Sequence, residues 1–155
     1  MKNICTVLCT TLSRLQGPRR VLADILDLLI RLYVAKVFFL SGLTKISDWD
    51  KTVFLFQEEY DVPLLPPEIA GALGTFGELF FPVLLALGLV TPLAALGLSF
   101  VNLMAVVSYW AVLKDAEPAL AQHMYWGTLL LVTLLHGPGR ISLDALFCWR
   151  LKKKA

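Results

Sequence analysis

The sequence predicts an all-α fold: an integral membrane four-helix bundle with an external interfacial helix between the first and second spans. Two observations lead to this fold class. The 155 residues are 57% hydrophobic and 17% charged, with a mean hydropathy of +0.71, whereas soluble domains are roughly half apolar and a quarter charged. The apolar residues also gather in four runs of about twenty residues, the length of helix that crosses a bilayer.

The four runs cover residues 22–43, 69–90, 92–113 and 119–136. Each is predicted to be a helix, because the membrane core offers no water to satisfy an open backbone. The fourth run is slightly short, so it is expected to tilt less or to thin the bilayer locally. We therefore divide the chain into an N-terminal tail (1–21), a membrane domain (22–147) and a basic tail (148–155).

The N-terminal tail begins with apolar residues broken by threonines and continues with Gly17-Pro18-Arg19-Arg20. It lacks the small-residue cleavage site of a signal peptide. Two expectations stay open for this tail: a short amphipathic segment at the membrane surface, or disorder.

Basic residues mark the orientation. Nine of the 14 Lys and Arg residues lie before the first apolar run or after the fourth, at Lys2, Arg14, Arg19, Arg20, Arg140, Arg150, Lys152, Lys153 and Lys154. Acidic residues dominate the two connections on the other side. Because Lys and Arg near the span ends set topology, both termini are predicted to be cytoplasmic.

The long outer connection, residues 44–67, is predicted to contain its own helix. Asp48 or Asp50 can cap its N-terminus, and Trp49 and the following phenylalanines are expected to face the acyl boundary. Val62-Pro63 and Pro66-Pro67 favour an extended connection into the second span. The helix can be a surface element that closes the bundle or a substrate lid.

Glu78 lies in the middle of the second apolar run. A charged side chain at that depth costs at least about 2.5 kcal/mol, so it needs a partner, a proton or a water-filled cavity. Gly71, Gly74 and Gly77 precede it and indicate a close helix junction. The expected neighbour is a small-residue stripe on the third run, at Ala95, Ser99 and Asn102.

Four further polar residues are candidates for the same site. Arg31 can pair with Asp27 on one helix face, can bind head groups, or can pair inside the bundle with Glu78 or another acid. Lys45 is an interfacial anchor or a site residue. Asn102 and His123 can hold helices together or bind a ligand. His123 has Gly127 at i+4 instead of a second ligand, so no metal site is predicted.

Several function classes are disfavoured. A net charge of +2 and basic residues confined to the ends do not indicate nucleic-acid binding. Cys5, Cys9 and Cys148 form no C-x-x-C pair. The sequence carries no haem-ligand pair, iron–sulfur cysteine set or nucleotide fingerprint.

An ordered set of motifs resembles the DoxX family over residues 22–147. The set comprises Arg31, the run from Phe39 to Lys45, Pro63, Gly77-Glu78-Leu79, the run from Leu87 to Pro92, His123, and the run from Gly137 to Asp144. The resemblance implies a small four-helix protein of the bacterial inner membrane, linked to redox or stress functions through partner proteins. The family takes its name from a subunit of a thiosulfate:quinone oxidoreductase.

Two functional hypotheses follow. In the first, the chain is an accessory membrane subunit of a redox system, and Arg31, Lys45, Glu78, Asn102 and His123 bind a quinone or a small anion, with electrons supplied by a redox partner protein. In the second, it is a non-catalytic scaffold that docks a partner protein. A lined cavity reaching Glu78 is expected for the first, and a Glu78 packed against a base for the second. Further copies of the chain are another expected partner, and a transporter ranks third.

Overall fold

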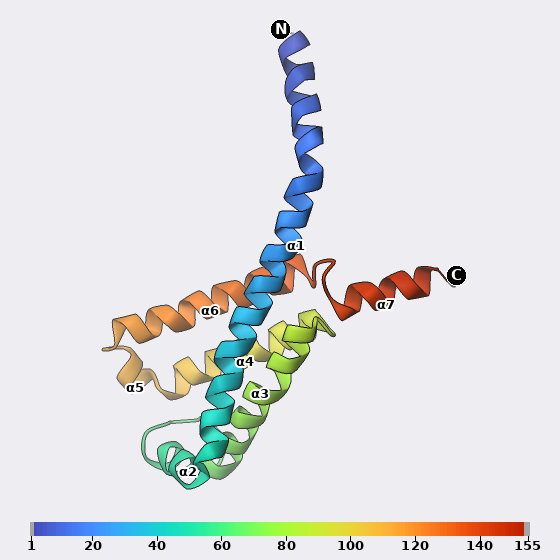
Figure 1. Cartoon of the computed structure of the whole chain (residues 1–155). Coiled ribbons are helices and arrows are strands. Elements are labelled where there is room, and N and C mark those ends of the chain that lie inside the picture. Colours follow the sequence, from blue (N-terminus) through green and yellow to red (C-terminus); the bar gives the residue numbers. More distant parts are fainter. Residues whose placement is uncertain (1, 154–155) are drawn as a thin grey trace.

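The computed structural model describes residues 2–153, and the side chains of residues 17 and 19–153. Within this part the chain is all-helical, with seven helices and no strand (Figure 1). The helices are α1 (Lys2–Ser47), α2 (Trp49–Glu58), α3 (Pro67–Leu87), α4 (Thr91–Ser108), α5 (Trp110–Leu113), α6 (Glu117–His136) and α7 (Leu143–Lys152). The all-α prediction is confirmed.

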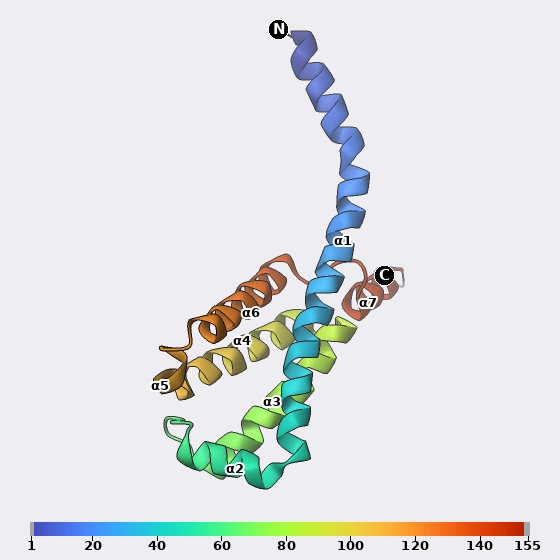
Figure 2. The ribbon, with the colours of Figure 1, turned by 60° about the vertical axis from the view of Figure 1, so that its left-hand side comes forward.

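The first helix is much longer than the first apolar run. α1 continues from Lys2 through Gly17-Pro18 to Ser47, and its N-terminal part projects away from the other helices (Figures 1 and 2). Residues 2–21 are therefore the beginning of the same helix that contains the first apolar run.

The four long helices share one core. α1 packs on α3, α3 on α4, α4 on α6, and α6 returns to α1. The fully buried apolar side chains come from all four helices: Val34, Ala35 and Phe38 from α1, Leu85 from α3, Ala94, Ala95 and Leu98 from α4, and Leu130 from α6.

Glycines set the helix spacing at two interfaces, between α3 and α4 and between α1 and α3. A Cβ added to Gly77 on α3 would stand 2.8 Å from Cγ2 of Val101 on α4, and one on Gly42 of α1 would stand 2.8 Å from Cγ of Leu79. On α4, Gly97 receives the ring of Phe81. The predicted close approach of α3 to α4 therefore involves Gly77, but its neighbour is Val101.

The expectation for Gly74 is wrong. A Cβ at Gly74 would meet only the tip of Phe56, at 3.8 Å, and a Cβ at Gly71 would meet the same ring at 3.5 Å. The reason is that α2 folds back onto the N-terminal half of α3 and covers its glycines with Phe56.

The predicted helix in the outer connection is α2, and it begins at the predicted cap. The Asp48 carboxylate accepts a hydrogen bond from the Lys51 N–H at 3.1 Å. Trp49 and Phe54 are exposed as expected, whereas Phe56 is buried. α2 lies across the outer ends of α1 and α3 (Figure 2).

The third apolar run is divided between two helices. α4 ends at Ser108, and α5 follows after Tyr109. The Asp61 N–H donates to the Ser108 carbonyl at 2.9 Å, and the Tyr60 and Tyr109 rings meet edge to face at 4.9 Å. Contacts from the outer connection thus accompany the end of α4.

Among the described helices, α3 and α4 are long and apolar enough to cross a membrane. Their outward faces carry large exposed apolar side chains: Leu73, Phe76, Phe80, Val83 and Leu87 on α3, and Leu93, Leu96, Phe100, Leu103 and Val107 on α4. Apolar surface of this extent marks a membrane or a protein partner. α1 and α6 include more polar side chains, among them Arg31, Lys36 and His123.

Candidate functional site

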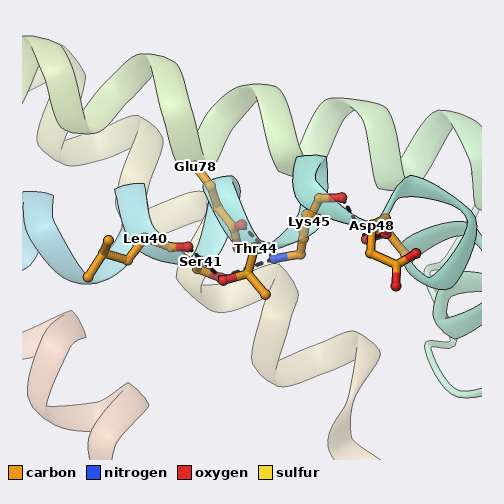
Figure 3. A network of polar contacts seen from close by, with 7 residues as sticks. Leu40, Ser41, Thr44, Lys45, Asp48 and Glu78 are labelled. Atoms are coloured by element: carbon orange, nitrogen blue, oxygen red, sulfur yellow. Dashed lines mark hydrogen bonds and ion pairs between the residues drawn. The ribbon is translucent and has the colours of Figure 1, made fainter.

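Lys45 and Glu78 form an ion pair between α1 and α3 (Figure 3). The Nζ atom of Lys45 lies 2.5 Å from Oε2 of Glu78 and also donates to the Ser41 hydroxyl at 3.2 Å. The side chains are 20% and 9% exposed respectively. Gly42 permits this pairing, because a Cβ there would stand 3.2 Å from Cβ of Glu78. Glu78 thus meets its base across a tight helix junction.

A groove of about 530 Å³ opens beside this pair, between the end of α1 and α2. Lys45 belongs to its lining, whereas Glu78 does not. The other lining residues are polar on α1 and mixed on α2 and its flanks: Ser41, Thr44, Ser47, Asp48, Lys51, Thr52, Leu55, Phe56 and Tyr60. The groove therefore reaches the ion pair through Lys45.

Two side chains define the outer end of the groove. The Thr52 hydroxyl is bonded to the carbonyls of Lys45 and Asp48, at 2.9 and 3.0 Å. This bond holds the corner between α1 and α2. Burial raises the pKa of the Tyr60 phenol, and Tyr109, Glu59 and Glu78 raise it further. Tyr60 therefore stays a neutral hydrogen-bond donor at neutral pH.

Asn102 and His123 form a second polar pair, between α4 and α6. The Asn102 amide donates to the His123 carbonyl at 3.0 Å, and its Oδ1 lies 2.9 Å from Nδ1 of the imidazole. The imidazole also meets the Trp126 ring edge to face, with centroids 5.1 Å apart. Both polar groups of the Asn102 side chain are thereby satisfied within the protein.

The two polar pairs lie at a similar level of the bundle. Gly77 and Val101, which are in contact, directly precede Glu78 and Asn102 in the sequence. Among the hydrogen bonds of the described side chains, none joins one pair to the other. Four of the five candidate residues therefore lie at a similar height in the bundle. They form two separate pairs, Lys45–Glu78 and Asn102–His123.

Arg31 lies elsewhere. It precedes Lys45 by 14 residues on α1, a separation of about 21 Å at the helical rise. Its side chain is almost fully buried and donates to the carbonyl of Leu85 at 3.3 Å and to the carbonyl of Ile141. The expected pairing of Arg31 with Glu78 is therefore wrong.

The expected pairing of Arg31 with Asp27 is also absent from the ion pairs of the described residues. Asp27 faces His136, at 3.4 Å from Nδ1. Leu85 belongs to the last turn of α3, where the helix dipole attracts a cation. The guanidinium therefore neutralises a helix end and holds the 137–142 connection.

Asp144 is a capping residue at the same end of the bundle that the sequence analysis did not select as a candidate. Its carboxylate accepts hydrogen bonds from the N–H of Val90, the N–H of Thr91 and the hydroxyl of Thr91, at 2.8, 2.9 and 2.9 Å. It thereby caps the start of α4, where Val90 provides no side-chain cap. That uncapped Val90-Thr91-Pro92 start is the signal in the sequence that a distant cap is needed.

Hydrogen bonding lowers the pKa of the Asp144 carboxyl group. Burial raises the pKa of Asp144, but the bonds from Thr91 and Val90 outweigh it, so the pKa lies below 3.8. A second contact at the same end is the ion pair between Arg140 and Asp24, at 2.6 Å. Contacts of Asp144, Arg31 and Asp24 thus all hold the C-terminal connection against this end of the bundle.

Comparison with known proteins places this arrangement in a family. A Haemophilus influenzae protein described as "Uncharacterized protein" is 29% identical over 128 residues, which cover 77% of this chain and 81% of that protein. No solved structure matches the chain significantly. The DoxX family profile matches residues 26–111, which include Arg31, Lys45, Glu78 and the tight α3–α4 junction. This match covers more than half of the sequence, so the chain belongs to the DoxX family.

Proposed function

We propose that the chain is a multi-pass protein of the bacterial inner membrane, with α1, α3, α4 and α6 as its four spans and both termini in the cytoplasm. The exposed apolar faces of α3 and α4 support this proposal. Two of the polar side chains on α1 and α6 are compatible with it, because Arg31 is buried and His123 is bonded to Asn102 of α4. The basic tails supply the orientation.

We further propose that the protein is an accessory membrane subunit of a redox system and that the groove beside Lys45 binds a quinone head group. The observation that carries this proposal is that Lys45, which is ion-paired with Glu78, lines an open groove. Lys45 has hydrogen-bonding capacity beyond Glu78 and Ser41, and Tyr60 and Lys51 are further donors along the wall. These donors suit the carbonyl oxygens of a quinone.

The charge balance of the groove favours a quinone over a small anion. Glu78 compensates Lys45, and Asp48 stands beside Lys51 in the lining. With two acids and two bases the site has no net positive charge to offer an anion. Leu55 and Phe56 add an apolar wall against which a ring can pack. Electrons are supplied by a partner protein in this scheme.

The test is binding of a short-chain ubiquinone analogue to the purified protein in lipid nanodiscs, measured by titration calorimetry. Loss of one hydrogen bond from a charged donor is expected to weaken binding about tenfold to a hundredfold, so Lys45→Gln should show this loss. Lys36→Gln is the matched control, because Lys36 is an exposed lysine on the same helix. Equal affinity of the Lys45→Gln and wild-type proteins would overturn the proposal.

The scaffold function is the second candidate, and a specific observation favours it. Glu78 is buried and packed directly against a base, as a purely structural charge would be. In that case the double variant Lys45→Met/Glu78→Met should preserve complementation of a deletion strain. The redox-subunit proposal expects the same double variant to be inactive while remaining folded in the membrane.

A further inference from the structure

α7 leaves the bundle at its inner end and has no helix packed over it. It runs across the direction of α1 and away from the other helices (Figures 1 and 2). None of its residues is buried. Its large apolar side chains, Leu146, Phe147, Trp149 and Leu151, are 42–68% exposed. Exposed apolar surface of this extent on a short helix indicates that the helix contacts a membrane or another protein.

The direction of α7 is nevertheless fixed. The Asp144 N–H donates to the Gly88 carbonyl at 2.9 Å, while its carboxylate caps α4. Ser142 caps α7 itself by accepting from the Ala145 N–H at 3.1 Å. Arg31 holds the carbonyl of Ile141, just before the helix. The first turn is thus bonded to the inner end of the bundle, and the remainder extends sideways.

Basic residues gather at the C-terminal end of α7. Arg150 and Lys152 lie in its last turn and Lys153 is its C-cap, whereas its single acid, Asp144, is already bonded to α4. The Lys153 ammonium lies over the Trp149 ring, 5.5 Å from its centroid. Phe147 and Leu151 line an open hollow that Arg150 and Lys153 flank. Long basic side chains beside apolar ones can reach anionic head groups while their stems and apolar neighbours contact acyl chains.

We propose that α7 is a membrane-surface helix that binds anionic lipids of the cytoplasmic leaflet. Phe147 and Leu151 enter the acyl boundary, and Arg150, Lys152 and Lys153 contact lipid phosphates. A second copy of α7 is a poorer occupant, because two such helices would bring six basic residues together. The proposal rests on the membrane orientation inferred above, but not on any ligand of the Lys45 groove.

The experiment is a depth measurement on the full chain. A nitroxide is attached to Cys148, which is exposed on α7, in a Cys5→Ser/Cys9→Ser background. The protein is placed in nanodiscs of phosphatidylcholine alone or mixed with phosphatidylglycerol. Accessibility to oxygen and to a water-soluble nickel chelate reports depth. We expect oxygen accessibility to rise and nickel accessibility to fall when phosphatidylglycerol is added.

Variants that lack basic residues distinguish binding of α7 to anionic lipids from simple exposure of α7 to solvent. Each basic residue near an anionic surface changes the ratio of bound to free helix roughly fivefold. The triple variant Arg150→Gln/Lys152→Gln/Lys153→Gln should therefore abolish the response to phosphatidylglycerol. Arg19→Gln/Arg20→Gln, which removes exposed charges from α1, should leave it unchanged.

A label on Leu64→Cys, in a background where all three native cysteines are Ser, is the control for general lipid effects, since Leu64 is fully exposed in the outer connection. It should not respond to phosphatidylglycerol. If Cys148 stays equally accessible to nickel in both lipids, or if the triple variant responds like its parent, the proposal is wrong. Nanodiscs expose both leaflets, so neither the cellular topology nor the quinone titration affects this outcome.

Discussion

Thr91 donates both its N–H and its hydroxyl to one carboxylate oxygen of Asp144, each at 2.9 Å, across 53 residues of sequence. The start of α4 is therefore capped by a residue of the last helix. Loss of an N-cap costs typically about 1 kcal/mol and up to about 2, and this cap also fixes the C-terminal connection.

Asp144→Ala should accordingly lower the free energy of unfolding by at least about 1–2 kcal/mol. The measurement is denaturant unfolding of the purified protein in mild detergent. Asp50→Ala is the matched control, because Asp50 lies in the first turn of α2 without the capping role of Asp48. A loss no larger than that of the control would show that the cap contributes nothing.

The same carboxylate should make stability depend on pH in the acid range. The pKa of Asp144 is below 3.8 in the folded protein, so its contribution is fully present above the unfolded pKa. That contribution disappears as pH falls from about 4 through the folded pKa. The wild-type protein should therefore lose more stability than Asp144→Asn over this range. If the melting temperatures of the two proteins fell equally as the pH was lowered from 5, the cap by the Asp144 carboxylate would be contradicted.

Gly77 and Gly74 should respond in opposite ways to alanine. Gly77→Ala places a methyl group against Val101 and should cost about 1–3 kcal/mol through overpacking. Gly74→Ala meets only the tip of Phe56 and should be neutral or stabilising by up to about 1 kcal/mol. Thermal melting in detergent compares them, and Val101→Ala should rescue Gly77→Ala. If Gly74→Ala melted at a lower temperature than Gly77→Ala, the packing of α4 against Gly77 would be contradicted.

Lys45 and Glu78 should behave as a coupled pair. Removing one partner of a buried ion pair costs about 3–5 kcal/mol, and the partial exposure of Lys45 should keep the value below that range. Glu78→Leu and Lys45→Met should each destabilise the protein, whereas Glu78→Gln keeps an acceptor for Lys45 and should cost less. The Lys45→Met/Glu78→Leu double variant should recover most of the loss. Strict additivity in a double-mutant cycle would mean that the pair does not interact.

Topology is tested by fusing a reporter that is active only in the periplasm. Fusions after Asp61 and after Glu117 should be active, and a fusion after Ala155 should be inactive, because basic residues concentrate in the two tails. Activity at the C-terminus would exclude an even number of spans with a cytoplasmic N-terminus.

The features predicted correctly from the sequence depend on local signals. The start of α2 follows from Asp48, whose partner is three residues away. The apolar runs identify the long helices because each carries its own pattern. The end of α4 at Ser108 carries no such signal, since it involves contacts from Tyr60 and Asp61.

The candidate site could be predicted only in part for a related reason. A buried acid requires a compensating base, and both Arg31 and Lys45 lie on the same helix. Only the register set by Gly42 against Leu79 decides in favour of Lys45. Arg31 bonds to main-chain carbonyls 54 and 110 residues away. Every residue has such a carbonyl, so no side-chain pattern reveals the partner.

The contacts of Arg31 and Asp144 also impose an order on biosynthesis. While the ribosome is still translating the segment before Ile141, α1, α3 and α4 already exist, but Arg31 lacks one of its carbonyl partners and α4 lacks its cap. Both needs are met only after residues 141–144 have been translated. The end of the bundle that contains Arg31 and Asp144 can therefore close only after the four long helices have been translated.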